Sequence, residues 1–213
     1  MIRNKETAAK TAESLLQIKA VKLNKNNPFT WASGWKSPIY CDNRKTLSYP
    51  AIRTYLRQEF SKLVKDEFGD VDIIAGVATG AIAIGVLVAQ ELGKPFVYIR
   101  SGNKGHGLQN KIEGVYSEGQ TAVVIEDLIS TGGSSLAAVE ALREAGVEVK
   151  GMAAIFTYGF KVAEERFEES KVRLFTLSDY EHLLAQALES GYITDDDLKS
   201  LQVWRKDPAG WGK

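Results

Sequence analysis

Cysteine is almost absent from this chain of 213 residues. The single one, Cys41, cannot form a disulfide within the chain, which favours a reducing compartment. Net charge is absent too, because 27 Lys and Arg residues balance 27 Asp and Glu residues. Proteins that bind nucleic acid broadly usually carry a basic excess, so this balance argues against that class. A local basic site for a small polyanion stays open.

Long hydrophobic runs are missing as well. The longest, near Ala81 to Ala89, is too short and too close to glycines to span a bilayer. The N-terminal stretch MIRNKETAAKTAESLL is polar and mixed in charge, without the apolar core of a signal peptide. We therefore expect a cytoplasmic protein whose partners include neither a membrane nor a nucleic acid.

What is present is the composition of an ordinary globular domain, with 44% hydrophobic and 25% charged residues. The length suits a single domain over residues 1–213. Residues 5–22 predict an amphipathic helix, and a turn-rich stretch follows. Ser48 and Pro50 then predict the cap and first turn of a helix that ends near Phe68.

From Val71 onward, short apolar strands alternate with helices. The expected strands lie within 71–78, 95–100, 121–128, 147–158 and 171–177. The expected helices span 81–92, 134–145 and most of 180–204. This alternation is typical of an α/β fold, in which a parallel β-sheet core is flanked by helices on both faces. The N-terminal residues form an additional segment outside that core.

Ligands of such sheets bind beyond the carboxyl ends of the strands, so the loops there are candidate sites. The loop GVATGA, residues 76–81, lets backbone N–H groups converge at a helix start, which suits an anion. A plain strand-to-helix turn explains the same residues. The loop RSGNKGHGLQNKIEG, residues 100–114, carries Arg100, Lys104, His106 and Lys111 among glycines. It suits a lid over a polyphosphate, although a solvated loop explains it better when it is considered alone.

The stretch TAVVIEDLISTGGSS, residues 121–135, is the most informative. It is neither a P-loop nor a dinucleotide-binding GxGxxG turn. The carboxylates of Glu126 and Asp127 suit hydrogen bonds from vicinal hydroxyls, such as those of a ribose. The hydroxyls and glycines that follow, at a helix N-terminus, suit a monophosphate. An acidic helix cap explains Asp127 but not the whole run, so the stretch predicts a ribose 5-phosphate site.

Three motifs in order resemble a known family. VVIEDLISTGGSS resembles the phosphoribosyl pyrophosphate motif of type I phosphoribosyltransferases. FTWASGWKSPIYCDNR, residues 29–44, resembles the N-terminal signature of the orotate phosphoribosyltransferases, and the loop at 100–114 resembles their Arg…Lys-x-His-Gly lid. The resemblance extends to about Tyr158.

The resemblance implies a reaction and an assembly. Orotate and phosphoribosyl pyrophosphate would give orotidine 5'-monophosphate and pyrophosphate, a step of de novo pyrimidine biosynthesis. Mg²⁺ would bind mainly through phosphoribosyl pyrophosphate, with no metal site made by the protein. The implied fold has five parallel strands and a small hood, to which residues 1–45 contribute. The implied assembly is a homodimer in which the lid of one subunit closes over the site of the other.

The resemblance also assigns roles to residues. Catalytic roles fall to Glu126, Asp127, Lys104 and His106. Binding of phosphoribosyl pyrophosphate falls to Arg100, Lys104, His106, Thr79, Gly80, Glu126, Asp127, Leu128, Ile129, Ser130, Thr131, Gly132, Gly133 and Ser134. Contacts with orotate fall to Ser130, Tyr40 and Cys41.

The chain departs from the family pattern in its charges. Glu126 stands where many members have Asp, and Ala32, Thr79 and Ser101 stand where some members carry lysine. Fewer cations near a polyanion leave more of its binding to the lid and the metal. Two alternatives stay open: a phosphoribosyltransferase for another nucleobase, and a non-catalytic regulator that senses a nucleotide. The 29–44 stretch argues against the first, and the lid cations with zero net charge argue against the second.

Overall fold

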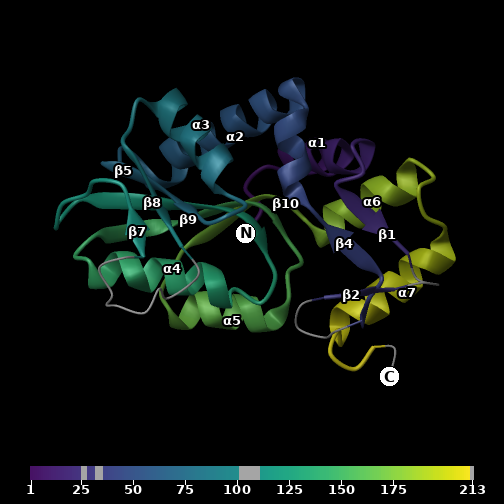
Figure 1. Cartoon of the computed structure of the whole chain (residues 1–213). Helices are drawn as coiled ribbons and strands as arrows, with labels where there is room; N and C mark the ends of the chain where they lie inside the picture. The colour runs from purple at the N-terminus through teal and green to yellow at the C-terminus, as the bar shows by residue number, and fades with distance from the viewer. Residues whose placement is uncertain (25–27, 32–35, 101–110, 212–213) are drawn as a thin grey trace.

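A six-stranded sheet lies at the centre of the computed structural model, which describes residues 1–24, 28–31, 36–100 and 111–211 (Figure 1). The strand order is β10-β9-β8-β5-β6-β7. All neighbours are parallel except β6 and β7, which are antiparallel. The strands are β5 (Ile73–Val77), β6 (Phe96–Ile99), β7 (Ile112–Glu113), β8 (Thr121–Ile129), β9 (Glu148–Thr157) and β10 (Leu174–Asp179). The parallel core confirms the predicted fold class, with β7 added to the five expected strands.

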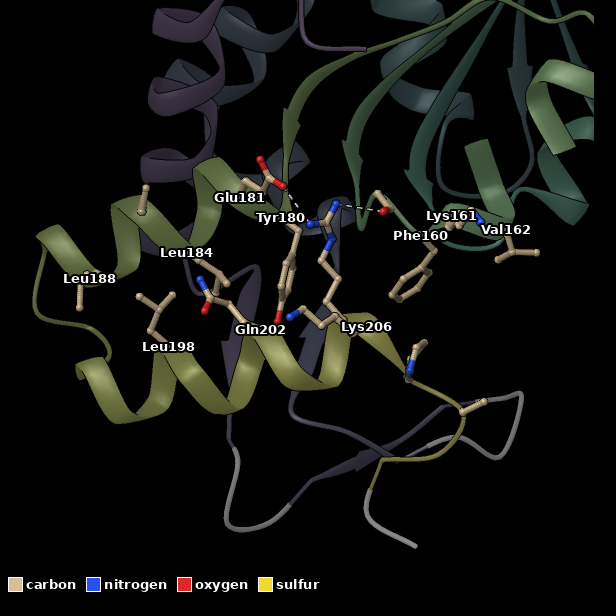
Figure 2. A pocket seen from close by; sticks show the side chains of 15 residues that line it. Phe160, Lys161, Val162, Tyr180, Glu181, Leu184, Leu188, Leu198, Gln202 and Lys206 are labelled. Atoms are coloured by element: carbon tan, nitrogen blue, oxygen red, sulfur yellow. Dashed lines mark hydrogen bonds and ion pairs between the residues drawn. The ribbon is translucent and has the colours of Figure 1, made fainter. Parts of the chain in front are cut away.

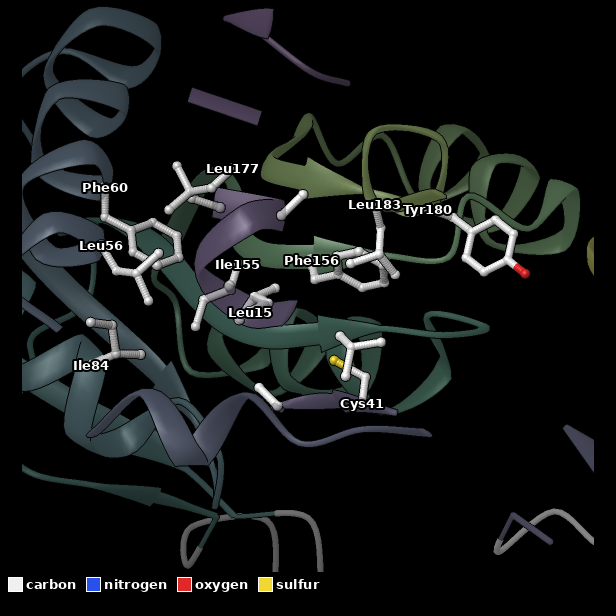
Figure 3. Packing of buried hydrophobic residues seen from close by; sticks show 14 of the residues in the cluster. Leu15, Cys41, Leu56, Phe60, Ile84, Ile155, Phe156, Leu177, Tyr180 and Leu183 are labelled. Carbon is white, nitrogen blue, oxygen red and sulfur yellow. The ribbon is translucent and has the colours of Figure 1, made fainter. Parts of the chain in front are cut away.

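Helices cover both faces of the sheet. One face carries α1 (Lys5–Gln17), α2 (Pro50–Phe68) and α3 (Ile82–Leu92), and the other carries α4 (Gly133–Glu144) and α5 (Lys161–Glu169) (Figure 1). Leu56 and Phe60 of α2 and Ile155 and Phe156 of β9 belong to the buried cluster of the first of these layers (Figure 3). Because β8 contributes buried side chains to both layers, its sequence is a continuous apolar run. Within the described residues, no helix combines the length and apolarity needed to cross a membrane.

Two short antiparallel strand pairs form the unit that we call the hood, and the C-terminal helices pack beside it. β1 (Val21–Leu23) pairs with β4 (Ile39–Cys41), and β2 (Phe29–Thr30) pairs with β3 (Lys36–Ser37). A 3₁₀ helix, η1 (Asn43–Ser48), leads from β4 to α2, while α6 (Tyr180–Glu189) and α7 (Asp195–Lys206) lie beside the hood strands (Figure 1). These segments from the two ends of the chain thus form one unit.

Trp204 of α7 joins that unit together. Its side chain is fully buried, and its ring centroid lies 5.6 Å from that of Trp31 in the hood. Its Nε1 donates a hydrogen bond to the carbonyl oxygen of Lys36 at 3.3 Å. Tyr158 and Phe160, which follow β9, also pack against the Trp204 ring. The hood therefore rests on the core through an aromatic cluster.

Two sequence predictions about helix ends were wrong. The helix expected over 5–22 ends at Gln17, because Lys19 takes a φ of 53° and Val21 pairs with Cys41 of β4. This strand pairing overrides the amphipathic pattern of the segment. Ser48 is not the cap of the following helix either: it ends η1, and Tyr49 occupies the cap position of α2.

Candidate active site

The carboxyl ends of β5, β6 and β8 meet at one edge of the sheet. Because β5 pairs in parallel with both other strands, the loops that follow them lie along the same edge. Ala78 to Gly80 follow β5, and the peptide bond between Ala78 and Thr79 is cis. A side chain at Gly80 would overlap the Asp127 carboxylate, so these two residues are in close approach. The structure therefore brings the first and third predicted loops together.

Glu126 is a buried acid held by two donors. Its side chain is 5% exposed. Oε2 accepts a hydrogen bond from the Ser135 hydroxyl at 2.8 Å, and Oε1 accepts one from the Asp127 backbone N–H at 2.9 Å. Burial, together with the charge of Asp127, raises the pKa of Glu126 to about 8. A further hydroxyl donor or a cation that reaches this carboxyl would therefore stabilise its ionised form.

Asp127 lies beside Glu126 at the mouth of the site. Burial raises its pKa, and a hydrogen bond with Glu126 and the charge of Arg44 partly offset that increase. Asp42 fixes the Arg44 guanidinium, with Nε to Oδ1 at 2.6 Å and Nη2 to Oδ2 at 3.0 Å. Two adjacent acids that are both poorly solvated form a strong acceptor site for vicinal hydroxyls or a divalent cation.

The turn from β8 into α4 has the geometry of an anion site. Gly132 occupies the cap position with a φ of 79°, a left-handed conformation that glycine adopts readily, and no side chain caps the helix. The N-terminus of α4 can therefore direct backbone N–H groups and its positive dipole end at a phosphate. Arg166 of α5 donates to the carbonyl oxygen of Thr131 at 3.0 Å and fixes the turn from behind. The remaining assigned residues of the run flank this turn: Leu128, Ile129, Ser130, Gly133 and Ser134.

Asn43 was missed in the sequence analysis and connects the hood to the acidic pair. It is 2% exposed, and its Nδ2 donates to the backbone oxygen of Asp127 at 2.5 Å. The thiol of Cys41 donates to Asn43 Oδ1 at 3.1 Å. Asn lies within the quoted 29–44 motif, but its partner is 84 positions away, which only the folded chain reveals.

Tyr40 and Cys41, which were assigned to orotate binding, point in different directions. Tyr40 is 41% exposed, and its ring lies 5.6 Å from that of Phe29. Cys41, the next residue, turns its side chain into the core, and burial raises the pKa of its thiol. The Tyr40 ring is therefore available to a ligand, whereas the Cys41 thiol belongs to the hydrogen bond with Asn43.

The described ends of the loop that we expect to be a lid carry positive charge. Arg100 follows β6, and Nη1 lies 3.0 Å from the Glu113 carboxylate of β7. Arg100, Lys111 and Ser134 line one cavity of about 280 Å³ at the start of α4. Lys104, His106, Ser101 and Ala32 lie outside the described residues, so their predicted roles stay predictions.

A groove of about 960 Å³ lies elsewhere, between α6, α7 and the residues that follow β9 (Figure 2). Its lining includes Phe160, Tyr180, Leu184 and Leu198. None of the residues assigned to catalysis or binding lines it. Volume alone would select this groove, but the carboxylates, glycines and hydroxyls gather at the sheet edge instead.

Comparison with known proteins agrees with this geometry. The phosphoribosyl transferase domain family matches residues 46–186. An orotate phosphoribosyltransferase of Phocaeicola vulgatus is 64% identical over 200 residues, which cover 94% of either chain. The chain belongs to the orotate phosphoribosyltransferase family. The resemblance drawn from the three motifs is thereby confirmed.

Solved structures support the assignment to this family. An orotate phosphoribosyltransferase of Aeropyrum pernix superposes with a TM-score of 0.74 at 26% identity, covering 86% of this chain and 99% of that one. A UMP synthase of Leishmania donovani superposes with a TM-score of 0.81 at 28% identity. That match covers 95% of this chain and 43% of the longer protein. The type I phosphoribosyltransferase fold is thus shared across the family.

Proposed function

We propose that this orotate phosphoribosyltransferase transfers the 5-phosphoribosyl group of phosphoribosyl pyrophosphate to a ring nitrogen of orotate. The bond from ribose C1 to the pyrophosphate oxygen breaks, and its electron pair leaves with pyrophosphate. The ring nitrogen of orotate releases its proton to solvent, and its lone pair forms the new bond to C1. The observation that carries the proposal is the acidic pair, Glu126 and Asp127, held next to the N-terminus of α4 and against Gly80.

The ribose phosphate would be bound at both ends. Ribose hydroxyls that reach the pair favour the ionised form of Glu126, whose pKa burial has raised, so the carboxylates of Glu126 and Asp127 accept hydrogen bonds from them. The turn from Ser130 to Ser134 receives the 5-phosphate at the helix N-terminus. As the bond to C1 breaks, the ribose ring gains positive charge, as in glycoside cleavage. The two nearby carboxyls stabilise that charge, so they act more strongly on the transition state than on bound substrate.

The leaving pyrophosphate gains negative charge and needs cations. Arg100 and Lys111 supply them from the described ends of the lid, and Lys104 and His106 supply more from the lid itself. Among the described residues, no group of three or more His, Cys, Asp or Glu side chains could hold a metal ion. We propose that Mg²⁺ binds mainly through the oxygens of phosphoribosyl pyrophosphate. When bound, Mg²⁺ adds positive charge next to the pyrophosphate.

Orotate would bind between the hood and the acidic pair. The exposed Tyr40 ring offers an apolar surface, and Ser130 offers a hydroxyl at the other side. Cys41 takes part through its bond to Asn43. A lid that excludes water protects the electron-poor ribose from hydrolysis, and we propose that it comes from the second subunit of a cytoplasmic homodimer.

The test is a base-selectivity assay. The pure protein is mixed with phosphoribosyl pyrophosphate, Mg²⁺ and orotate, and the loss of orotate absorbance is followed, with adenine, hypoxanthine and uracil in parallel. Turnover of orotate alone, abolished when Mg²⁺ is omitted, is the expected result. Turnover of a different base would overturn the proposal that the hood binds orotate. Binding of phosphoribosyl pyrophosphate without turnover of any base would favour the regulator.

A further inference from the structure

Ser135 differs from the other helical serines whose hydrogen bonds the structure shows. Ser14, Ser61 and Ser190 each donate the hydroxyl to the carbonyl four residues earlier in their own helix. Ser135 stands in the first turn of α4 and instead donates to the carboxylate of Glu126 on β8, at 2.8 Å. This bond therefore joins the phosphate-binding helix to the acid expected to bind the ribose.

The Glu126 carboxyl is held by the Ser135 hydroxyl and by the backbone and side chain of Asp127. Ser135 donates to Oε2, and the backbone N–H of Asp127 donates to Oε1. A carboxylate has about two acceptor directions on each oxygen, so these bonds leave further directions on both. We expect the ribose hydroxyls to use the acceptor capacity that remains. The hydrogen bonds to Ser135 and to the Asp127 backbone limit the rotation of the carboxylate, and so they set the plane in which it meets its ligand.

We propose that Ser135 is a positioning residue that orients the Glu126 carboxylate toward the ribose hydroxyls of phosphoribosyl pyrophosphate. The inference rests on the proposed function and adds to it a residue outside the assigned phosphate turn. Ser135 is 2% exposed and Glu126 is 5% exposed, so water replaces the hydroxyl poorly when it is removed. A misaligned or protonated Glu126 would bind the diol less well.

The electrostatic consequence has a definite sign. Asp127 is the charged group that faces Glu126, and it raises the pKa, as burial does. The Ser135 hydroxyl lowers the pKa by donating to the ionised form. Arg44 and Asp42 act on Asp127 from the hood side. Removing the hydroxyl therefore moves the titration of Glu126 to higher pH.

The experiment compares Ser135→Ala with Ser61→Ala. Ser61 is also a buried helical serine, but its hydroxyl bonds only to the Arg57 carbonyl within α2. Affinity for phosphoribosyl pyrophosphate with Mg²⁺ is measured by calorimetry, and kcat/KM for the same substrate is measured against pH. Ser135→Ala should weaken affinity about 10-fold or more and shift the acid limb of kcat/KM to higher pH. Ser61→Ala should leave both near the wild-type values.

A double-mutant cycle separates positioning from packing. In a Glu126→Ala background, Ser135→Ala should weaken binding no further, because the hydroxyl has lost its partner. Affinity of Ser135→Ala within twofold of wild type, or equal losses in both backgrounds, would overturn the proposal. If Ser135→Ala does not fold, Ser135→Cys keeps the volume with a weaker donor, and wild-type affinity in that variant would count against it. If wild type binds phosphoribosyl pyrophosphate but turns over no orotate, the proposed function fails while the binding series still tests Ser135.

Discussion

Single residues at the site are held in surroundings that favour ligand binding over stability. Burial gives Glu126 a pKa of about 8 in the folded chain, against 4.5 as its ordinary value. Gly80 leaves just enough space for the Asp127 carboxylate. Both arrangements put acceptor oxygens where a ribose is expected, and both make the protein sensitive to small changes there.

The pH dependence of stability should reveal the buried acid. Between about pH 4.5 and pH 8, folded Glu126 keeps a proton that the unfolded chain releases, so its contribution to stability falls as pH rises through that window. Glu126→Gln removes this titration. We expect the free energy of unfolding in urea to fall less steeply with pH in the variant than in wild type. Parallel pH dependences of the two proteins would contradict the burial of an ionisable Glu126.

Gly80→Ala should damage the site through one added methyl group. The new Cβ would overlap the Asp127 carboxylate, so either the loop or the acid must move. Because small displacements of reacting groups are costly, we expect kcat/KM for phosphoribosyl pyrophosphate to fall on the order of 10²-fold. Gly69→Ala serves as the control, because its Cβ meets nothing within 4 Å and Gly69 precedes β5, at the end of the strand opposite Gly80. The strain of alanine at its φ of 73° should therefore affect stability alone. Equal activity of the two variants would argue against the close approach.

At the scale of elements, the hood depends on helix α7. Trp204 contacts Trp31 of the hood and also Tyr158 and Phe160 of the segment that follows β9. Asn43 then extends this connection from the hood to β8 through the Asp127 carbonyl. The base-binding and ribose-binding parts are therefore positioned by elements that are distant in sequence.

Trp204→Ala should destabilise the fold and impair the base site selectively. Emptying a fully buried Trp position costs about 3–5 kcal/mol, measured as the free energy of unfolding in denaturant. The KM for orotate should rise more than the KM for phosphoribosyl pyrophosphate, because the hood carries Tyr40. Trp204→Phe keeps a ring and loses the bond to Lys36, so it should cost about 1 kcal/mol. An equal rise of both KM values in Trp204→Ala would place the effect outside the hood.

At the scale of the whole molecule, the lid is the part that a second subunit would share. Arg100 and Lys111 bring its two ends to the start of α4. A desolvated phosphate that loses one such cation loses about 2–4 kcal/mol of transition-state stabilisation. The proposed assembly therefore predicts strong effects of lid residues on turnover.

Lys104→Ala should lower turnover on the order of 10²-fold or more. If the lid serves the partner's site, mixing this variant with Asp127→Asn should regenerate one intact site in each hybrid dimer. We expect the mixture to recover about a quarter of wild-type activity after subunit exchange. If the mixture forms hybrid dimers but recovers no activity, the lid closes over the site of its own subunit. If Lys104→Ala alone keeps near-normal activity, Lys104 has no role in the lid.

The sequence by itself determined the class of the fold and the family to which the chain belongs. The parallel strands were predictable because burial on both faces demands continuous apolar runs, as in Ala122 to Ile125. The motif that indicated the family was recognisable because its acids, hydroxyls and glycines are contiguous. Such features are local, so spacing along the chain is enough to recognise them.

The tertiary structure decided which side chains support that motif. Asn43 reaches the Asp127 carbonyl across 84 positions, and Ser135 reaches Glu126 because α4 packs back on β8. Strand pairing also ended the first helix at Gln17, where the amphipathic pattern continued. These contacts depend on long-range packing, in which one polar residue among many acquires a partner only when the sheet and its helices are assembled.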